Sequence, residues 1–295
     1  DPTIEVVHVL TPNREHADIS IDALHAGKHV MCEKPMAKTA ADARRMVAAA
    51  KETGKKLTIG YQHRQKAQTQ YARELIRDGV LGEIYYANCY AIRRRGTPNW
   101  GVFLNEEEQG GGPIIDIATH SLDLTLSLMN NYEPAMVVGK THKMLEHPEA
   151  GNIWGDKGVS TTPLEEAACA MIVMKNGATI MLETSWALNT DEPIAEGSCR
   201  LCGSRAGLAI KNDALTVNKI EYNRAVDSTV DTKAGGVAFY SGAKVTPAVT
   251  EAHNWIRAVV EDTDPVVLPE QACVVSEILE AIYVSSKTGK AVYFE

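Results

Sequence analysis

Three short apolar runs alternate with two helical stretches near the start of the chain, and this alternation restricts the fold more than any other feature. The apolar runs lie at Ile4–Leu10, His29–Cys32 and Leu57–Tyr61, as expected of short buried strands. Residues 14–26 and 39–53 repeat apolar side chains at helical spacing. Strands that alternate with helices predict a doubly wound parallel sheet with right-handed crossovers.

A polar segment follows each of these three predicted strands. The segments are Thr11-Pro12-Asn13, Glu33-Lys34-Pro35 and Gln62-His63-Arg64. Ligands of open parallel sheets bind outside the carboxyl ends of the strands. Turns are polar in most proteins, so one such segment would carry little weight. Three in succession, one with a lysine followed by proline, predict a binding edge.

The periodicity changes after about residue 63, where strands begin to follow strands. A helical segment precedes several long alternating runs, some joined by tight turns such as Lys175-Asn176-Gly177, which is typical of an antiparallel or mixed sheet. The expected strands are Glu83–Arg94, Met136–Lys143, Glu166–Met174 and Thr179–Trp186, and the expected helices are Gln68–Asp78, Val249–Glu261 and Glu270–Lys287. We therefore predict two domains: residues 1–62, part of a doubly wound α/β domain, and residues 63–295, an α/β domain with a large open sheet.

Charge and cysteine usage narrow the class of ligand. The chain has 30 basic and 38 acidic residues, a net charge of -8, which disfavours nucleic acid and anionic membranes and favours a small-molecule ligand. Its longest apolar runs fall far short of the roughly 20 residues that cross a bilayer. Six cysteines spread over a long chain indicate a reduced, cytoplasmic protein. Only Cys199 and Cys202 form a C-x-x-C, with no second ligand pair nearby, so we expect no metal.

The richest segment chemically runs from Gly110 to Met129. Three glycines and Pro113 open a predicted apolar helix. Asp116, His120 and Asp123 are spaced i, i+4 and i+7 on it and should share one face. Burying such groups without partners costs on the order of several kcal/mol. The stripe must therefore meet other polar groups.

Three interpretations of this stripe compete. An Asp–His pair can be satisfied inside the core or at an interface without any chemical role. Carboxylate and imidazole on one face can also bind a metal, although no further ligand cluster accompanies them. In the third interpretation His120 is a general base, Asp116 orients it, and Lys34 polarises the reacting oxygen.

Several segments together resemble a known family. They are T-P-N-R-E-H-A-D at Thr11–Asp18, A-G-K-H-V-M-C-E-K-P at Ala26–Pro35 and G-G-G-P-I-I-D-I-A-T-H-S-L-D at Gly110–Asp123. The chain resembles the glucose-fructose oxidoreductase, inositol dehydrogenase and rhizopine-catabolism oxidoreductases, the Gfo/Idh/MocA family, over essentially its whole length. The E-K-P and the D-x-x-x-H helix are specific in combination.

The resemblance implies a fold and residue roles. It implies a partial Rossmann domain followed by an α/β domain whose open, mostly antiparallel sheet forms a homodimer or homotetramer interface. Lys34, Asp116 and His120 match the family's catalytic positions. The positions that approach the cofactor are matched by Thr11, Pro12, Asn13, His16, Glu33, Lys34 and Gln62. For the substrate pocket the resemblance points to Arg64, Trp100 and Tyr283 besides Asp116 and His120.

One family motif is absent. The G-x-G-x-x-G that seats a pyrophosphate at a helix N-terminus does not occur, and the residue that selects NAD or NADP is absent too. Because the chain also opens on Asp1 rather than Met, we expect it to lack about 60 N-terminal residues, at roughly 30 per β–α unit. We accordingly expect weak dinucleotide binding.

The predicted activity is that of an NAD- or NADP-dependent dehydrogenase of a sugar, cyclitol or related polyol. A secondary alcohol would lose its proton to His120 while hydride passes to the nicotinamide. Two alternatives stay open. One is an NAD-dependent glycosidase or lyase of the same family, in which oxidation is transient, and the other is a nonenzymatic ligand-sensing regulator.

Overall fold

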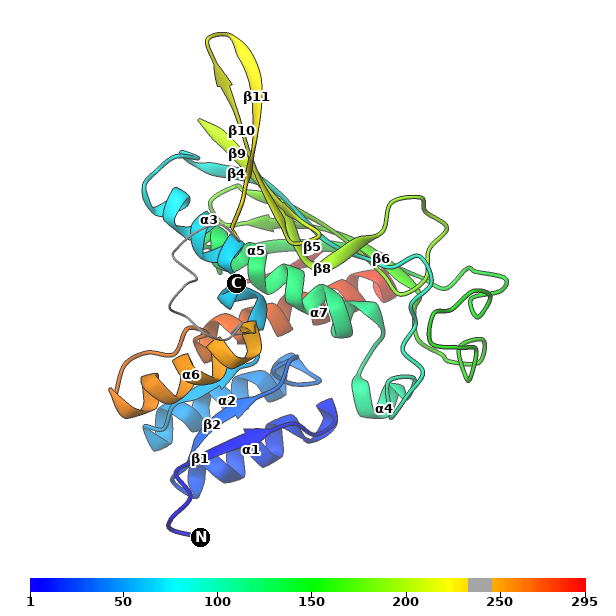
Figure 1. Cartoon of the computed structure of the whole chain (residues 1–295). Helices are drawn as coiled ribbons and strands as arrows, with labels where there is room; N and C mark the ends of the chain where they lie inside the picture. Colours follow the sequence, from blue (N-terminus) through cyan, green and yellow to red (C-terminus); the bar gives the residue numbers. More distant parts are fainter. Residues whose placement is uncertain (233–245) are drawn as a thin grey trace.

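Two β-sheets organise the computed structural model, which describes residues 1–232 and 246–295. A three-stranded sheet lies at one end of the molecule, a nine-stranded sheet lies at the other, and helices α5 and α7 lie between them (Figure 1). Helix α5 spans Thr119–Met129 and α7 spans Pro269–Thr288. Segments from both halves of the sequence therefore meet in the middle of the molecule.

The small sheet is parallel, as the alternation of strands and helices predicts. Its strands lie in the order β1-β2-β3, with Val7 opposite Val30 and Met31 opposite Thr58. The elements are β1 (Val6–Val9), α1 (His16–His25), β2 (His29–Cys32), α2 (Ala40–Thr53) and β3 (Leu57–Ile59). Strand β1 is shorter than the apolar run, because its partner β2 supplies only four residues for pairing.

Capping residues set the limits of the helices near this sheet. The Thr39 hydroxyl accepts a hydrogen bond from the Asp42 amide at 3.1 Å, and Gly54 ends α2 with a φ of +64°, which agrees with the helix predicted over residues 39–53. Helix α1 begins two residues later than expected, because a 3₁₀ turn at Asn13–Glu15 follows Pro12.

The large sheet is mixed and mostly antiparallel, which also agrees with the sequence. Its order is β11-β10-β9-β8-β4-β7-β6-β5-β12, and only β4 and β7 run parallel. The strands are β4 (Ile84–Ile92), β5 (Pro134–His142), β6 (Ala167–Met174), β7 (Thr179–Ser185), β8 (Ile194–Gly203), β9 (Ala206–Lys211), β10 (Ala214–Glu221), β11 (Arg224–Val230) and β12 (Val292–Tyr293).

Helices cover one face of this sheet. Leu122 and Leu126 of α5 and Ile278 and Ile282 of α7 are fully buried, as are inward-facing strand residues such as Ile172. The other helices are α3 (Ala67–Arg77), α4 (Glu106–Gln109) and α6 (Pro247–Val260). Among the described residues, no helix combines the length and apolar character required to cross a bilayer.

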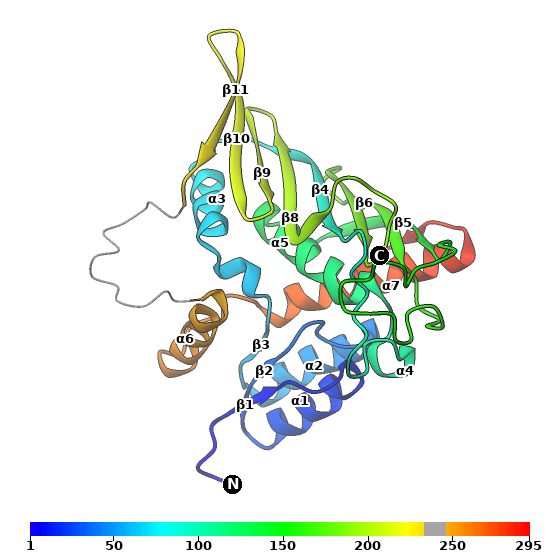
Figure 2. The same cartoon turned by 45° about the vertical axis from the view of Figure 1, so that its right-hand side comes forward.

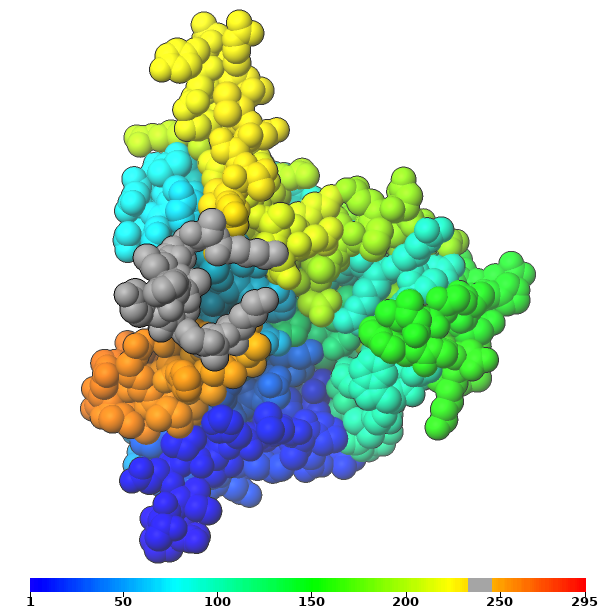
Figure 3. All heavy atoms as spheres, in the orientation of Figure 1, coloured from blue at the N-terminus to red at the C-terminus, as the bar shows by residue number. Residues whose placement is uncertain are grey.

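The hairpin of β10 and β11 projects from the body of the molecule, as two views of the structure show (Figures 1 and 2). The space-filling view shows it as a narrow extension at the end opposite the N-terminal residues (Figure 3). Tyr222, in its turn, is 97% exposed. The candidate site lies far from this extension, toward the small sheet.

Candidate functional site

A cavity of about 350 Å³ lies at the carboxyl ends of β1 and β2. Its wall combines the segments that follow both strands with the loop Gly101–Phe103 and Asp116. The sequence predicts seven residues near a cofactor, and the structure places six of them on this wall: Thr11, Pro12, Asn13, His16, Glu33 and Lys34. Gln62 is half-buried at the end of β3 and does not line the cavity.

Two of the six wall residues hold the loops together. The ring of His16 lies between two carbonyl oxygens, with Nδ1 2.8 Å from Pro35 O and Nε2 2.9 Å from Thr11 O. Asn13 donates from Nδ2 to Gln109 O at 3.0 Å. The polar atoms of these two side chains therefore fix the strand-end segments to each other and to the end of α4.

Lys34 and Asp116 form the charged floor of the cavity. The Lys34 ammonium donates to the Asp116 main-chain oxygen at 2.8 Å and to its Oδ1 at 3.1 Å. The other carboxylate oxygen, Oδ2, accepts from Trp186 Nε1 at 2.9 Å and lies 3.7 Å from Arg93 Nη1. Donors on several sides thus hold this carboxylate in one orientation.

His120 follows Asp116 by four residues and lies in an almost dry environment. Its ring is 7% exposed and packs edge-on against the ring of His63, with the centroids 4.9 Å apart. Within the described part of the chain, the Nδ1 atoms of both rings have no hydrogen-bond partner.

Burial sets the protonation of both rings. Burial lowers the pKa of His120 well below its usual value, and the positive charge of Lys34 lowers it further. Burial also lowers the pKa of His63 to about 4. Both imidazoles are therefore neutral at neutral pH.

Asp123 does not meet Asp116, contrary to the prediction of one ionisable face. Its carboxylate is fully buried and pairs with Arg64, whose Nε and Nη2 donate to it at 2.9 and 2.7 Å. Residues 114–118 form a π-helical turn before α5 begins. A π turn carries more residues than an α turn, which offsets Asp116 from the spacing that the prediction assumed.

Arg64 and Tyr283 lie away from the cavity that holds Lys34. Arg64 is 1% exposed, and besides Asp123 it donates to Val266 O and Gln271 Oε1. The structure therefore places it in the core rather than on the pocket wall suggested by the resemblance. Tyr283 lines a different cavity of about 580 Å³ and donates to Glu165.

Trp100 lies close to the rim of the 350 Å³ cavity. It is 49% exposed and packs against Trp154 and Phe103, with ring centroids 4.9 and 5.4 Å away. Phe103 itself lines the cavity. Trp100 therefore belongs to an aromatic cluster beside the opening.

The sequence did not identify Arg93 and Trp186 as partners of Asp116. Arg93 directly follows β4, and Trp186 directly follows β7. These two strands are the parallel pair of the large sheet, so their carboxyl ends meet at one edge, where both side chains approach Asp116. The rule that ligands bind at the carboxyl ends of parallel strands points to Arg93 and Trp186 once the pairing of β4 and β7 is known.

Sequence models of one protein family match both parts of the chain. Residues 1–61 match an oxidoreductase family model with an NAD-binding Rossmann fold, and residues 69–209 match the GFO/IDH/MocA C-terminal domain. The chain belongs to the Gfo/Idh/MocA oxidoreductase family. The resemblance seen in the sequence is thereby confirmed.

The Gfo/Idh/MocA relatives include enzymes named for sugar substrates. The D-glucoside 3-dehydrogenase of Escherichia coli (strain K12) is 39% identical over 206 residues, which are 70% of this chain and 58% of that protein. The 1,5-anhydro-D-fructose reductase of Ensifer adhaerens is 38% identical over 142 residues, 48% of this chain and 42% of that protein. The matched segments thus span about half the length of these curated relatives.

Solved structures of this fold cover nearly the whole chain. The aldose-aldose oxidoreductase from Caulobacter crescentus, complexed with glycerol, is 25% identical with a TM-score of 0.79, and the alignment covers 100% of this chain and 80% of that one. A levoglucosan dehydrogenase in complex with NADH and levoglucosan is 23% identical with a TM-score of 0.83, covering 99% and 80%. At 23% identity, the likeness to the levoglucosan dehydrogenase shows a shared fold and nothing further.

Proposed function

We propose that this chain transfers hydride between a secondary alcohol of a sugar, cyclitol or related polyol and NAD or NADP. The observation that carries the proposal is the Lys34–Asp116 contact at 3.1 Å on the floor of a cavity at the carboxyl ends of parallel strands. His120, neutral and unpartnered at Nδ1, follows Asp116 by four residues. These groups suit proton transfer from a hydroxyl.

The residues around the cavity fit a nicotinamide cofactor. Its position outside the strand ends is the one that dinucleotides take in such sheets, and its wall has a mixed polar and apolar character. Thr11, Pro12, Glu33 and Lys34 would hold the cofactor there. When bound, the nicotinamide supplies or accepts the hydride.

Each catalytic side chain has a separate task in the proposed reaction. His120 accepts the hydroxyl proton, because a neutral imidazole has a free lone pair. The Lys34 ammonium stabilises the negative charge that develops on the oxygen. Asp116 orients Lys34 through their 3.1 Å contact, and Trp186 and Arg93 hold Asp116 from the other side.

We propose a substrate with secondary ring hydroxyls, as in a glycoside or anhydrosugar. The names of the two curated relatives support this substrate class. The exposed aromatic side chain of Trp100 and its neighbours beside the opening would suit the apolar face of a sugar ring. The cavity floor supplies charged groups for its hydroxyls.

In this proposal the two predicted domains have different roles: residues 1–62 bind the cofactor, and residues 63–295 bind the substrate and form the contact between copies of the chain.

The face of the large sheet opposite α5 and α7 supports a homodimer or homotetramer. Met171 and Met181 are paired across β6 and β7 and partly exposed there, and Val138 on β5 is 41% exposed. All six cysteines are free thiols, which supports a reducing, cytoplasmic location.

The proposal is tested by screening sugars, glycosides and cyclitols with millimolar NAD or NADP, so that weak cofactor binding does not hide turnover. Substrate-dependent formation of NADH or NADPH is expected, with an equivalent amount of keto product. Product formation without net reduced cofactor would instead indicate a transiently oxidising glycosidase or lyase. Substrate binding without any chemical change would indicate a regulator.

A further inference from the structure

The helix that carries the proposed catalytic residues begins on a carboxylate from a distant segment. Glu165 precedes β6, and its Oε1 and Oε2 accept from the Gly112 amide at 3.0 and 3.1 Å. Oε1 also lies 3.4 Å from the Ile114 amide. The helix has no side-chain cap of its own at this end. Glu165 therefore satisfies amides that would otherwise lack partners.

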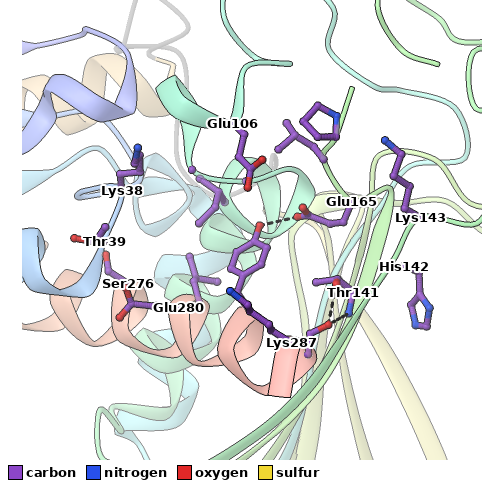
Figure 4. Close-up of a pocket in the computed structure, with 18 of the residues that line it drawn as sticks. Lys38, Thr39, Glu106, Thr141, His142, Lys143, Glu165, Ser276, Glu280 and Lys287 are labelled. Carbon is purple, nitrogen blue, oxygen red and sulfur yellow. Dashed lines mark hydrogen bonds between the residues drawn. The ribbon is translucent and has the colours of Figure 1, made fainter. Parts of the chain in front are cut away.

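Tyr283 of α7 holds this carboxylate in place. Its hydroxyl donates to Glu165 Oε1 at 2.7 Å, and the dashed line at Glu165 in Figure 4 marks this bond. The pair forms part of the wall of the 580 Å³ cavity. Burial raises the pKa of the Glu165 carboxyl, whereas the donors around it, the Tyr283 hydroxyl and the Gly112 and Ile114 amides, favour its ionised form.

The glycine run makes this close approach possible. A Cβ on Gly111 would lie 2.0 Å from the Tyr283 hydroxyl oxygen, and a Cβ on Gly112 would lie 2.7 Å from the Glu165 main-chain oxygen. Any larger residue would push the pair away from the helix. The glycines therefore allow tight packing at the start of this helix.

Asp116 is two residues beyond Ile114, and its main-chain oxygen and carboxylate both contact Lys34. A shift of the helix start would therefore move the acceptor that orients the lysine. We propose that Glu165 and Tyr283 are positioning residues, which fix the start of this helix and thereby align Asp116 and His120 with Lys34. The effect on turnover rests on the proposed function, whereas the effect on the helix does not.

Hydrogen–deuterium exchange tests the structural half of the inference on the chain itself. Glu165→Gln removes the charge at constant shape, and Tyr283→Phe removes only the hydroxyl. Exchange of amides 110–118 should accelerate about tenfold in Glu165→Gln and less in Tyr283→Phe, because local opening becomes easier. Glu280→Gln, an exposed α7 residue that lines the same cavity, is the matched control and should exchange like the wild type.

Steady-state kinetics test the functional half. In both variants kcat should fall about tenfold or more while KM for the sugar and the melting temperature change little, since misalignment acts on the reacting groups. Glu280→Gln should keep the wild-type kcat.

The two measurements separate the possible failures. Unchanged exchange over residues 110–118 in Tyr283→Phe, which keeps the fold even if Glu165→Gln does not, would overturn the inference. Faster exchange with an unchanged kcat would also overturn it, because the pair would then only stabilise the helix. A wild-type chain without turnover on any polyol would refute the proposed function, and exchange would still decide the structural contact.

Discussion

Lys34 and His120 have different roles in the proposed reaction, and each can be substituted separately. Lys34→Met removes the ammonium, and His120→Gln removes the proton acceptor. Each should lower kcat by about 10²- to 10⁴-fold, far more than it weakens NADH binding, because most of the cavity wall remains.

The matched control for this pair is Lys38→Met. Lys38 lies four residues beyond Lys34 and donates to Glu107 O at the 580 Å³ cavity, so its loss should spare kcat. Near-normal kcat in Lys34→Met or His120→Gln would remove that residue from the mechanism.

The buried histidines also make stability depend on pH. The pKa of His63 falls to about 4 in the folded chain, against about 6.5 when unfolded, so the unfolded chain binds more protons between these values. The contribution of each such histidine to the free energy of unfolding is fully present above about pH 6.5. It is lost as the pH drops toward 4, by up to about 1.4 kcal/mol per pH unit.

Urea unfolding at a series of pH values measures this dependence. His63→Gln should flatten the decline, and His253→Gln, at an exposed position on α6, should leave it unchanged. An equally steep decline in His63→Gln would show that other groups cause the loss.

At the scale of elements, a buried ion pair joins the 3₁₀ turn Gln62–Gln65, which follows β3, to α5. Arg64 and Asp123 are 1% and 0% exposed, and their nitrogen–oxygen distances are 2.9 and 2.7 Å. Removing one partner leaves a buried charge uncompensated, so Asp123→Ala or Arg64→Met should cost about 3–5 kcal/mol of unfolding free energy.

A double-mutant cycle measures this pair. Arg64→Met combined with Asp123→Leu should cost less than the sum of the single variants, because no unpaired charge remains. The exposed pair of Lys66 and Asp213, 2.7 Å apart, is the control and should contribute at most about 1 kcal/mol. Additive losses at Arg64 and Asp123 would contradict the coupling.

At the scale of the whole molecule, the uncovered face of the large sheet is the proposed contact between copies. Light scattering should give the mass of a dimer or tetramer for the wild type. Met181→Lys, in the pair with Met171 on that face, should shift the mass toward the monomer, because it places a charge in an apolar contact. The control is Ile220→Lys, because Ile220 is 70% exposed on the projecting hairpin of β10 and β11. A monomeric wild type would refute the proposed assembly.

Local patterns in the sequence determine much of the fold. Alternating strands and helices imply the parallel pairing of β1, β2 and β3, and Thr39 and Gly54 mark the ends of α2 because capping depends on residues close in sequence. The strand-end rule finds the segments around Thr11 and Lys34, which line one cavity. These features depend on the spacing of residues close in sequence, so they can be predicted without the structure.

Tertiary contacts decided the rest. Arg64 meets Asp123 across 59 residues, and Tyr283 meets Glu165 across 118, so no local spacing could assign these four side chains. Helical spacing predicts one face for Asp116 and Asp123, but the π-helical turn separates them. The sequence by itself determined the strands, the helices and the charged residues available to a site. The pairing of distant segments decided which of those charges face the cavity. Burying a charge without a partner costs free energy, so each buried charge pairs with a group that the tertiary fold places beside it.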